Sequence, residues 1–458
     1  MGADPGEAQL ASPLGPATVG FAVAGVAAIA LSVEVASGGP IFVARWGILA
    51  RLTAWVVVWA VGVACALRLP RRVAMGAVFT LAVALRLGAL AGPPVLSDDL
   101  YRYAWDGRVQ AAGVDPYLYP PSSPQLASLR EGWLWPDDRG CERLERPPGC
   151  TRLNRPAERT IYPPLAQAWF ATVYRLAGTG AAHKAWQVAG LLGDVALVGL
   201  LPMVLRAWGR DERWTALYAL SPFPVVEVVN NGHVDGLAAL LVVGAVLAAA
   251  RRRPGWGGVL LGAAALVKLY PVLLVVALVG APAGGRRLSS VGRAAGPAAA
   301  VLAAGYLPHV AAVGVRVLGY LPGYLREEDY TQGGRYLLAG LLPVPGLSTS
   351  IVAAAGLGAV IAWVLVTRPS VPRAGLALMG ALLLVTTPVQ PWYAVTLLAL
   401  ATVAVAPRFA LVAAAGYPYY LAVILDAPHQ DAVGRASYGT ALAGVALGAW
   451  LNKGRRAA

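Results

Sequence analysis

The chain has 458 residues, of which 58% are hydrophobic and 13% are charged, and its mean hydropathy is +0.61. This composition excludes an ordinary water-soluble domain, in which charged residues make up about 25% of the chain. The net charge of +14 does not indicate a nucleic-acid-binding protein, because such proteins gather their basic residues on one folded face. Here the basic residues lie in short segments between long apolar runs, so the sequence predicts a membrane protein.

The basic segments set the expected topology, because cytoplasmic loops of membrane proteins are rich in Lys and Arg. In chain order they contain Arg68, Arg71 and Arg72; Arg206, Arg210 and Arg213; Arg251 to Arg253; Arg286, Arg287 and Arg293; Arg368 and Arg373; and Lys453, Arg455 and Arg456. We interpret these segments as cytoplasmic turns and not as ligand sites.

Apolar runs, each close to the roughly 20 residues that cross a bilayer, follow one another along most of the chain. We expect helices near residues 17–36, 50–68, 73–91, 184–205, 213–229, 234–250, 295–313, 348–367, 374–388, 392–406, 409–425 and 437–451. A further run, 257–282, begins and ends beside basic segments, and Pro271 inside it predicts two short spans. The predicted fold class is an all-α polytopic membrane helix bundle of about 12–14 transmembrane helices, one integral membrane domain over residues 1–458.

Two long hydrophilic loops are expected on the side opposite the basic segments, at residues 92–160 and 314–347. The run 161–176 follows the first loop, but it is short and contains Gln167 and Arg175. We therefore expect this run at the membrane interface or in a re-entrant position instead of across the bilayer.

The first loop opens with an acidic helix start. We expect Ser97 to cap a helix that carries Asp98 and Asp99 in its first turn and ends at Gly113. Three amphipathic aromatic residues of this helix, Tyr101, Tyr103 and Trp105, are expected at the level of the lipid headgroups. The aspartates also have a simpler interpretation, in which they stabilise the helix dipole and Asp98 pairs with Arg102.

Three further polar features are expected at the same face of the membrane: segment 230–235, Lys268 and segment 390–393. Lys268 interrupts an apolar run, where an ionisable residue is costly and usually faces a cavity or a partner, so we interpret it as functional. A polar turn explains segment 230–235 equally well, and an aromatic anchor explains segment 390–393 equally well.

The first loop also carries two of the three cysteines, Cys141 and Cys150, whereas Cys65 falls in an apolar run. A loop outside the cytoplasm lies in an oxidising compartment, so we expect a local disulfide between these two residues. They are too few, and lack nearby histidines, for a zinc site, and no metal site is assigned.

Several short motifs occur in order along residues 97 to 395. They are Asp98-Asp99 with Tyr101 and Arg102, Gly113-Val114-Asp115-Pro116-Tyr117, Tyr162-Pro163-Pro164, Asn231-Gly232-His233-Val234-Asp235-Gly236, Leu266-Val267-Lys268-Leu269-Tyr270-Pro271 and Gln390-Pro391-Trp392-Tyr393. On these motifs the chain resembles the GT-C superfamily of polytopic glycosyltransferases. More narrowly it is similar to bacterial polyprenyl-phosphomannose-dependent mannosyltransferases and, distantly, to the catalytic subunit of glycosylphosphatidylinositol mannosyltransferase I.

The resemblance implies transfer of a sugar, most directly mannose, from a polyprenyl-phosphate donor to an extracytoplasmic glycan or lipid acceptor. It implies a multi-pass protein of the bacterial cytoplasmic membrane with its active site on the outer face. In that superfamily an acidic motif on the first long loop supplies the catalytic residue, which gives Asp98 or Asp99 the role of general base in an inverting reaction. Which aspartate acts stays open, as does the use of a divalent cation; no cofactor is assigned.

A departing phosphate needs positive charge nearby, and the candidates are Lys268, His233, Arg335 and Arg102. The other candidates for the donor site are Tyr162, Trp392 and Tyr393, which are expected to stack on the sugar or line a lipid groove, together with Gln390 and with Asp235, which is expected to orient His233.

Other functions fit some of these features. A secondary transporter or lipid flippase also has broken helices and charges within the membrane, although the chain has no evident inverted repeat and its first loop is unusually long for that class. The same fold acting on another polyprenyl-phosphate sugar, such as arabinofuranose or glucose, is a second alternative. A non-catalytic assembly subunit is a third.

Overall fold

The computed structural model describes residues 15–178, 180, 182–280, 287–342 and 344–457; Arg286, one of the predicted cytoplasmic arginines, lies outside them. Within these ranges the chain is helical and contains no β-strand, which confirms the predicted all-α polytopic bundle. Six of the described helical segments are long and apolar enough to cross a membrane, and shorter apolar helices complete the bundle.

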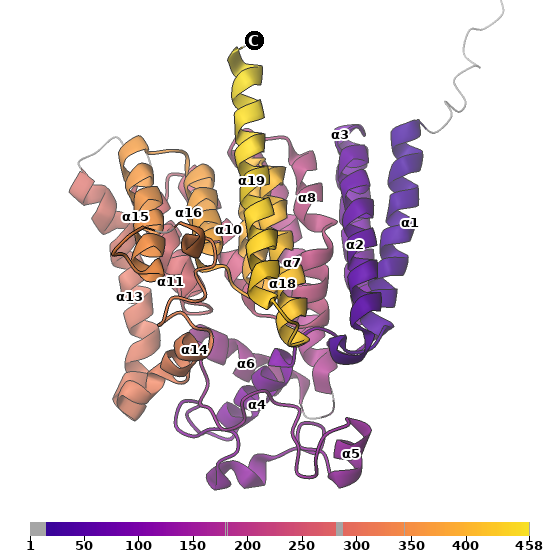
Figure 1. Ribbon diagram of the computed structural model, residues 1–458, viewed down its shortest axis with the longest axis vertical. Helices are drawn as coiled ribbons and strands as arrows, with labels where there is room; N and C mark the ends of the chain where they lie inside the picture. The colour runs from indigo at the N-terminus through magenta and orange to yellow at the C-terminus, as the bar shows by residue number, and fades with distance from the viewer. Residues whose placement is uncertain (1–14, 179, 181, 281–286, 343, 458) are drawn as a thin grey trace, which may run out of the picture.

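The first three helices stand together at one side of the bundle, on the right of Figure 1. They are α1 (Pro16–Ser37), α2 (Ile41–Ala66) and α3 (Arg71–Gly88), and the short η1 (Ala89–Ala91) follows. α2 begins at Ile41 instead of near residue 50, with a kink at Ala44. The arginines that interrupt its apolar pattern do not prevent this, since Arg51 pairs with Glu34 of α1 at 3.2 Å.

The central segment contains several broken helices. Its elements are α7 (Ala182–Ala207), η4 (Glu212–Trp214), α8 (Thr215–Ala219), α9 (Pro222–Pro224), η5 (Val225–Asn230), α10 (Asp235–Ala250), α11 (Pro254–Ala265), η6 (Tyr270–Leu274) and α12 (Val275–Val279). The single helix expected over 213–229 is wrong, because the helix breaks at Leu220 and Ser221, immediately before Pro222. η5 is a π-helical turn, a form common at functional sites. The predicted interruption at Lys268 is confirmed by the gap between α11 and η6.

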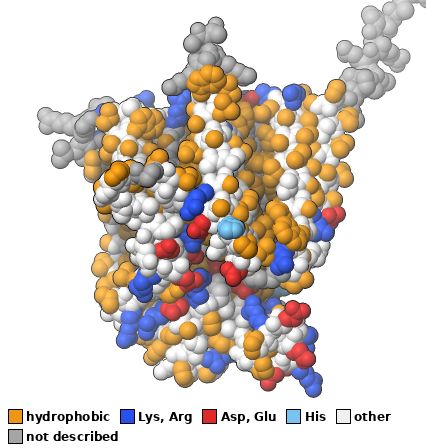
Figure 2. All heavy atoms as spheres, in the orientation of Figure 1, with side chains coloured by type: hydrophobic (Ala, Val, Ile, Leu, Met, Phe, Trp, Pro, Cys, Tyr) orange, Lys and Arg blue, Asp and Glu red, His pale blue; other side chains and the backbone are white. Residues whose placement is uncertain are grey.

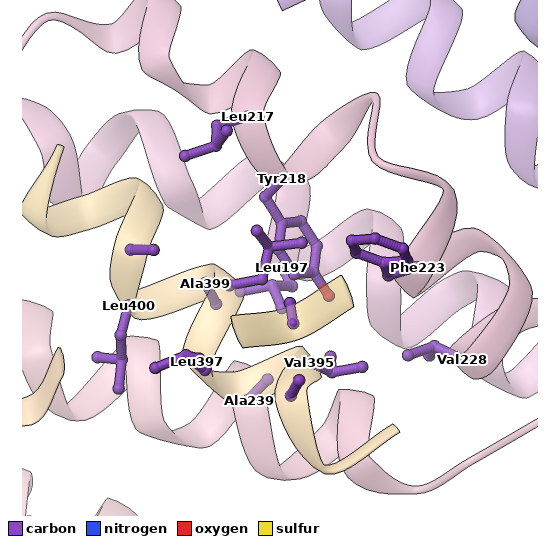
Figure 3. Close-up of a cluster of buried hydrophobic side chains, with 14 of the residues drawn as sticks. Leu197, Leu217, Tyr218, Phe223, Val228, Ala239, Val395, Leu397, Ala399 and Leu400 are labelled. Atoms are coloured by element: carbon purple, nitrogen blue, oxygen red, sulfur yellow. The ribbon is translucent and has the colours of Figure 1, made fainter. Parts of the chain in front are cut away.

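The last segment ends in the helix that carries the C-terminus, at the top of Figure 1. Its elements are α13 (Arg287–Val313), η7 (Gly314–Leu318), α14 (Leu321–Glu327), η8 (Ala339–Leu341), α15 (Thr349–Thr367), α16 (Val371–Thr386), η9 (Pro391–Ala394), α17 (Val395–Ala404), η10 (Pro407–Phe409), α18 (Ala410–Ile424) and α19 (Gln430–Ala457). α17 is apolar on all sides and every residue from Val395 to Val403 is buried, as expected for a helix inside a bundle. Figure 3 shows its side chains among Leu197, Tyr218 and Ala239 of α7, α8 and α10.

A fully buried ion pair joins three helices of this bundle. Nε of Arg86 on α3 lies 2.6 Å from Oδ2 of Asp194 on α7, and the Tyr218 hydroxyl on α8 donates to the other oxygen of Asp194 at 2.6 Å. Both charged side chains have no exposed surface. Charges survive such burial only when they are paired and hydrogen-bonded, so this cluster holds α3, α7 and α8 in one arrangement.

The first loop and the helix after it form a layer at one end of the bundle, the lower end in Figure 1. Its elements are α4 (Asp99–Ala111), η2 (Pro124–Leu129), α5 (Asp138–Arg143) and α6 (Pro164–Ala177). α4 crosses α6 closely at Gly107, where a Cβ atom would lie 2.6 Å from the carbonyl oxygen of Phe170. α4 starts one residue later than the sequence predicted, because Asp98 and not Ser97 is its N-cap and only Asp99 lies in the first turn; Ser97 accepts a hydrogen bond from the Asp99 amide at 3.2 Å. The helix ends just before Gly113, whose φ is +79°.

The aromatic residues of α4 do not face lipid headgroups, which corrects the expectation from the sequence. Tyr101, Tyr103 and Trp105 are each at most 6% exposed. Tyr103 stacks on Phe170 of α6 with ring centroids 4.4 Å apart, and Trp105 packs edge-on against Trp135. These rings form the core of the loop layer, because the layer is thick enough to bury both faces of α4.

The two ends of the bundle differ in charge. Segments 67–70, 208–214, 251–253 and 368–370, beside the predicted cytoplasmic arginines, lie at the end opposite the loop layer (Figure 1). On the face shown in Figure 2, charged side chains gather over the lower half and along the upper margin, and the band between them is mostly apolar or uncharged. This distribution is that of a protein whose middle band contacts hydrocarbon.

Candidate active site

A cavity of about 1180 Å³ lies where the loop layer meets the helix bundle. The start of α4 and segment 143–163 form its polar side, and residues of α16 and α18 form an apolar side. Of the predicted site residues, Asp98, Asp99, Arg102, Tyr162, Lys268, Gln390, Trp392 and Tyr393 line the cavity, whereas His233, Asp235 and Arg335 are not among its lining residues. Segments far apart in the sequence therefore meet at one cavity.

Asp98 and Asp99 open α4 but have different partners. Nη2 of Arg146 lies 3.1 Å from Oδ2 of Asp98. Burial raises the pKa of the Asp98 carboxyl above its usual value, and the charge of Arg146 opposes this shift. The alternative pairing of Asp98 with Arg102 is wrong, because Arg102 turns along α4 to Asp106, at 3.0 Å. Arg102 also donates to the carbonyl oxygen of Glu158, so its guanidinium group is bound to partners inside the loop layer.

Asp99 is held by two uncharged donors. The amide of Asn154 donates to its Oδ1 at 2.6 Å, and the hydroxyl of Tyr162 donates to its Oδ2 at 3.0 Å. Burial raises the pKa of Tyr162 well above its usual value, so its hydroxyl keeps its proton and remains a donor. These contacts fix the orientation of the Asp99 carboxylate without neutralising its charge, at the edge of the cavity.

His233 lies directly behind Asp99. Its Nε2 atom is 3.9 Å from Oδ2 of Asp99, and its Nδ1 atom is 3.2 Å from Oε2 of Glu227. Its ring stacks on Trp392 with a centroid distance of 4.0 Å. The expectation that Asp235 orients His233 is wrong, because Asp235 begins α10 and faces Lys268, whereas the turn after η5 folds His233 back over Glu227.

Glu227 was not found from the sequence, although a signal for it exists. It stands between valines in the run 225–229, and an ionisable residue in an apolar membrane segment indicates function by default. The same argument identified Lys268. In the structure the Glu227 side chain is fully buried, and the Tyr417 hydroxyl of α18 donates to its Oε1 at 2.7 Å.

Lys268 lies in the gap between α11 and η6, where it reaches the cavity. Its Nζ atom is 3.3 Å from Oδ2 of Asp235 and 5.2 Å from the ring centroids of both Tyr162 and Tyr393. The carboxylate and the two aromatic faces stabilise a charge that a membrane interior otherwise disfavours. The interruption of the helix therefore places one cation beside the aspartates.

Segment 390–393 connects the cavity to the second loop. Gln390 donates to Oε1 of Glu328 at 2.8 Å, and the hydroxyls of Tyr324 and Tyr393 lie 3.0 Å apart. Arg335 pairs with Glu328 at 3.0 Å and also bonds to Tyr419. Arg335 thus fixes Glu328, which in turn accepts a hydrogen bond from Gln390. The charge of Arg335 is balanced by that of Glu328.

The cavity also has an arginine-rich wall that the sequence analysis missed. It consists of Arg143, Arg146, Arg152, Arg155 and Arg159. Arg155 reaches across to Glu327 of α14, with Nε 3.0 Å from Oε2. The signal was six arginines between residues 139 and 159, on a loop where the rule for membrane topology predicts few.

The two loop cysteines form a disulfide, with their Cα atoms 5.8 Å apart. The turn that it closes contains Arg143 and Arg146, both of which line the cavity. Cys65, in α2, is not disulfide-bonded. Among the described residues, no three His, Cys, Asp or Glu side chains gather as a metal-binding group.

The fold and the cavity define a multi-pass membrane protein that brings carboxylates, cations and an apolar wall together at one end of its helix bundle. Residues 160–388, half of the chain, match glycosyltransferase family 87, and the chain belongs to this family of membrane glycosyltransferases. No curated protein and no solved structure matches the chain. The matched region includes His233 and Lys268 but begins after Asp98 and Asp99.

Proposed function

We propose that this glycosyltransferase moves a sugar, most directly mannose, from a polyprenyl-phosphate donor to the hydroxyl group of an extracytoplasmic glycan or lipid, with inversion and with Asp99 as general base. The observation that carries the proposal is the position of Asp99 at the cavity, its carboxylate oriented by Asn154 and Tyr162 and, among the described residues, paired with no Lys or Arg. Family membership favours an enzyme over a transporter or flippase.

The reaction needs one base and one leaving group. Asp99 takes the proton from the acceptor hydroxyl while the acceptor oxygen bonds to the anomeric carbon. The bond from that carbon to the donor phosphate breaks on the opposite face, and the phosphate oxygen keeps the electron pair. This is the base-assisted half of inverting glycoside chemistry, and a positioned general base contributes typically 10²–10⁴-fold.

The cations around the cavity suit the departing phosphate. Arg146, Arg152 and Lys268 line the cavity together with the aspartates, and Arg guanidinium groups bind phosphate with good geometry. We assign the donor phosphate to these three residues. Arg335 is a weaker choice because it does not line the cavity, and Arg102 is a weaker choice because its guanidinium group is turned to Asp106 and to the carbonyl oxygen of Glu158 inside the loop layer.

The apolar side of the cavity suits a lipid-linked donor. Met379, Leu382 and Leu383 of α16 and Val423 and Ile424 of α18 line it, and they continue into the hydrophobic band of the bundle. A polyprenyl chain gains free energy from such a surface in proportion to the apolar area that it covers. The cavity lies at the end opposite the basic segments, so we assign it to the outer face of a bacterial cytoplasmic membrane.

The test is transfer of radiolabelled mannose from polyprenyl-phosphomannose by the protein in native membranes. Asp99→Asn is expected to lower the rate about 10²–10⁴-fold. The matched control is Asp138→Asn, which changes an aspartate of the same loop that does not line the cavity and is expected to retain the full rate. Equal rates for Asp99→Asn and the unaltered protein would exclude Asp99 as the base. Transfer only from a donor with another sugar, such as arabinofuranose, would change the donor and leave the mechanism intact.

A further inference from the structure

Glu227 is a carboxyl group deep in the bundle that the proposed mechanism does not use. The side chain has no exposed surface, and a buried carboxylate is costly unless donors surround it. Its two oxygens have different surroundings: Oε1 accepts from the Tyr417 hydroxyl at 2.7 Å, whereas Oε2 lies 3.2 Å from Nδ1 of His233 and has no hydrogen-bond partner among the described residues. The carboxylate thus faces one nitrogen of an imidazole whose other nitrogen faces Asp99.

The three residues form a row. Glu227 comes from η5, His233 from the turn after it and Asp99 from α4, and the His233 ring bridges the two carboxylates with distances of 3.2 and 3.9 Å. Stacking on Trp392 prevents the ring from tilting out of the row. Gly232, with φ +68°, makes the turn that places His233 there, and a Cβ atom at this position would lie 2.9 Å from Leu100 of α4.

We infer that Glu227 is a positioning residue that holds the proton of neutral His233 on Nδ1, so that Nε2 is free to accept the proton that Asp99 collects from the acceptor. The inference rests on the proposed function, because Asp99 collects a proton from the acceptor only if it is the general base. The contact between Glu227 and Nδ1 of His233 is within ion-pair distance but is not a hydrogen bond in this geometry. A carboxylate beside one imidazole nitrogen favours the tautomer that carries its proton on that nitrogen, and among the described ion pairs Glu227 is the carboxylate next to Nδ1 of His233.

The proton balance of this step is simple. The acceptor O–H proton moves to Oδ2 of Asp99 as the new glycosidic bond forms, and then to Nε2 of His233. A shift of about 1 Å closes the 3.9 Å gap to hydrogen-bond distance. The resulting imidazolium lies between the carboxylates of Glu227 and Asp99, and after product release the proton returns through Asp99 to the open cavity.

Other titratable groups surround this row and enter any pH dependence. Asp98 precedes Asp99 on α4, and Asp235 with its partner Lys268 lies beside His233. On α18, Tyr417 and Tyr420 face Glu227. None of them contacts the Nδ1 atom of His233 among the described contacts, so Glu227 is the group that distinguishes the two nitrogens.

The tautomer is directly measurable. The chain has four histidines, so the nitrogen spectrum of ¹⁵N-histidine-labelled protein is simple, and His233→Asn identifies the signals of this ring. We expect the unaltered protein to carry the proton on Nδ1, and Glu227→Gln to shift it toward Nε2. A ring protonated on Nε2 in the unaltered protein would overturn the inference whatever the enzyme transfers.

Kinetics test whether Glu227 acts through His233. Glu227→Gln is expected to lower kcat about 10–100-fold with little change in the KM of the donor, and to move the acid limb of the pH–rate profile to lower pH, because a neutral amide stabilises the imidazolium less. In a His233→Asn background the same change is expected to have no further effect, since residues that act as a unit are not additive. Additive losses, or an unchanged pH profile, would show that Glu227 is only structural.

Asp194→Asn is the matched control. Asp194 is a fully buried carboxylate of the same bundle, paired with Arg86 and Tyr218 away from the cavity. Its loss is expected to lower the unfolding temperature without moving the pH profile of the remaining activity. If Glu227→Gln does not fold, the nitrogen spectrum of the unaltered protein still decides the inference. If the unaltered protein transfers no sugar, the proposed function fails, and the tautomer remains a separate result.

Discussion

Nη2 of Arg146 lies 3.1 Å from Oδ2 of Asp98, and this ion pair links the disulfide-closed turn of the first loop to the N-cap residue of α4. The turn has little secondary structure beyond α5, a helix of six residues. The disulfide therefore holds in place a cation that lines the cavity. In the proposed function, this covalent link sets the position of a cation that binds the donor phosphate.

Removal of the disulfide is expected to impair donor binding. Replacement of Cys141 and Cys150 by serine frees a loop with a sequence separation of 9, and closure of a loop of that size stabilises it by about 2–3 kcal/mol. The unfolding temperature in detergent falls and the KM of the donor rises, because Arg146 is no longer held. The control is Cys65→Ser, which changes the cysteine of α2 that is not disulfide-bonded. An unchanged KM in the double variant would contradict this role of the turn.

Asp98 is expected to lower the stability of the protein at neutral pH. Burial raises the pKa of its carboxyl above the usual 3.8, so the folded protein binds this proton more tightly than the unfolded chain does. Stability therefore falls as the pH rises through the window that begins near 3.8 and ends at the raised pKa. We expect Asp98→Asn to unfold at a higher temperature than the unaltered protein at pH 7, and at the same temperature below that window.

Thermal unfolding at a series of pH values measures this difference. Glu142→Gln, at an exposed position of the same loop, serves as the control and is expected to follow the unaltered protein throughout. A lower unfolding temperature for Asp98→Asn at pH 7 would mean that the ion pair with Arg146 outweighs the cost of burial.

Lys268→Met is expected to affect stability and catalysis separately. Its partner Asp235 is fully buried, and removal of one member of such a pair costs about 3–5 kcal/mol because the other charge stays behind. The double variant Lys268→Met with Asp235→Asn is expected to recover most of the stability but not the rate, since the cation near the phosphate is still missing. Transfer at the normal rate by the double variant would remove Lys268 from the mechanism.

Arg152→Gln is expected to weaken donor binding. Arg152 lines the cavity, over the ring of Tyr101, and loss of a hydrogen bond to a charged group costs about 1.5–3 kcal/mol, or about 10–100-fold in the KM of the donor. Arg139→Gln, at an exposed position of the same loop that does not line the cavity, is the control. Equal KM values for the two variants would place the phosphate elsewhere along the arginine wall.

Some of the site was predictable from single residues. Lys268 and Pro271 predicted the helix interruption, since each is costly in an apolar helix. Ser97 and Gly113 predicted only approximately where the first loop helix begins and ends, because Asp98 is its N-cap and Ala112 its C-cap. Glu227 and the arginines of segment 139–159 carried comparable signals. Each of these residues is energetically unfavourable at its position in the sequence, so its presence alone is informative.

Partners were less predictable. Asp98 had a plausible partner four residues away in Arg102 and found one in Arg146 instead, and His233 was assigned to Asp235 but faces Glu227. The aromatic residues of α4 suggested a membrane surface and proved to be the core of the loop layer. In each case sequence proximity suggested a neighbour, and packing between distant segments supplied a nearer one.

The sequence by itself determined that the chain is a multi-pass helical bundle, which residues interrupt the apolar runs and where the long loops fall, because the bilayer imposes one length, one composition and one charge rule on every span. Only the tertiary structure decided which charges meet. Pair energies depend on distances of a few ångströms in a medium of low dielectric constant, and those distances arise when the first loop folds under the helix ends. That folding sets Asp99 beside Tyr162 and places His233 behind it.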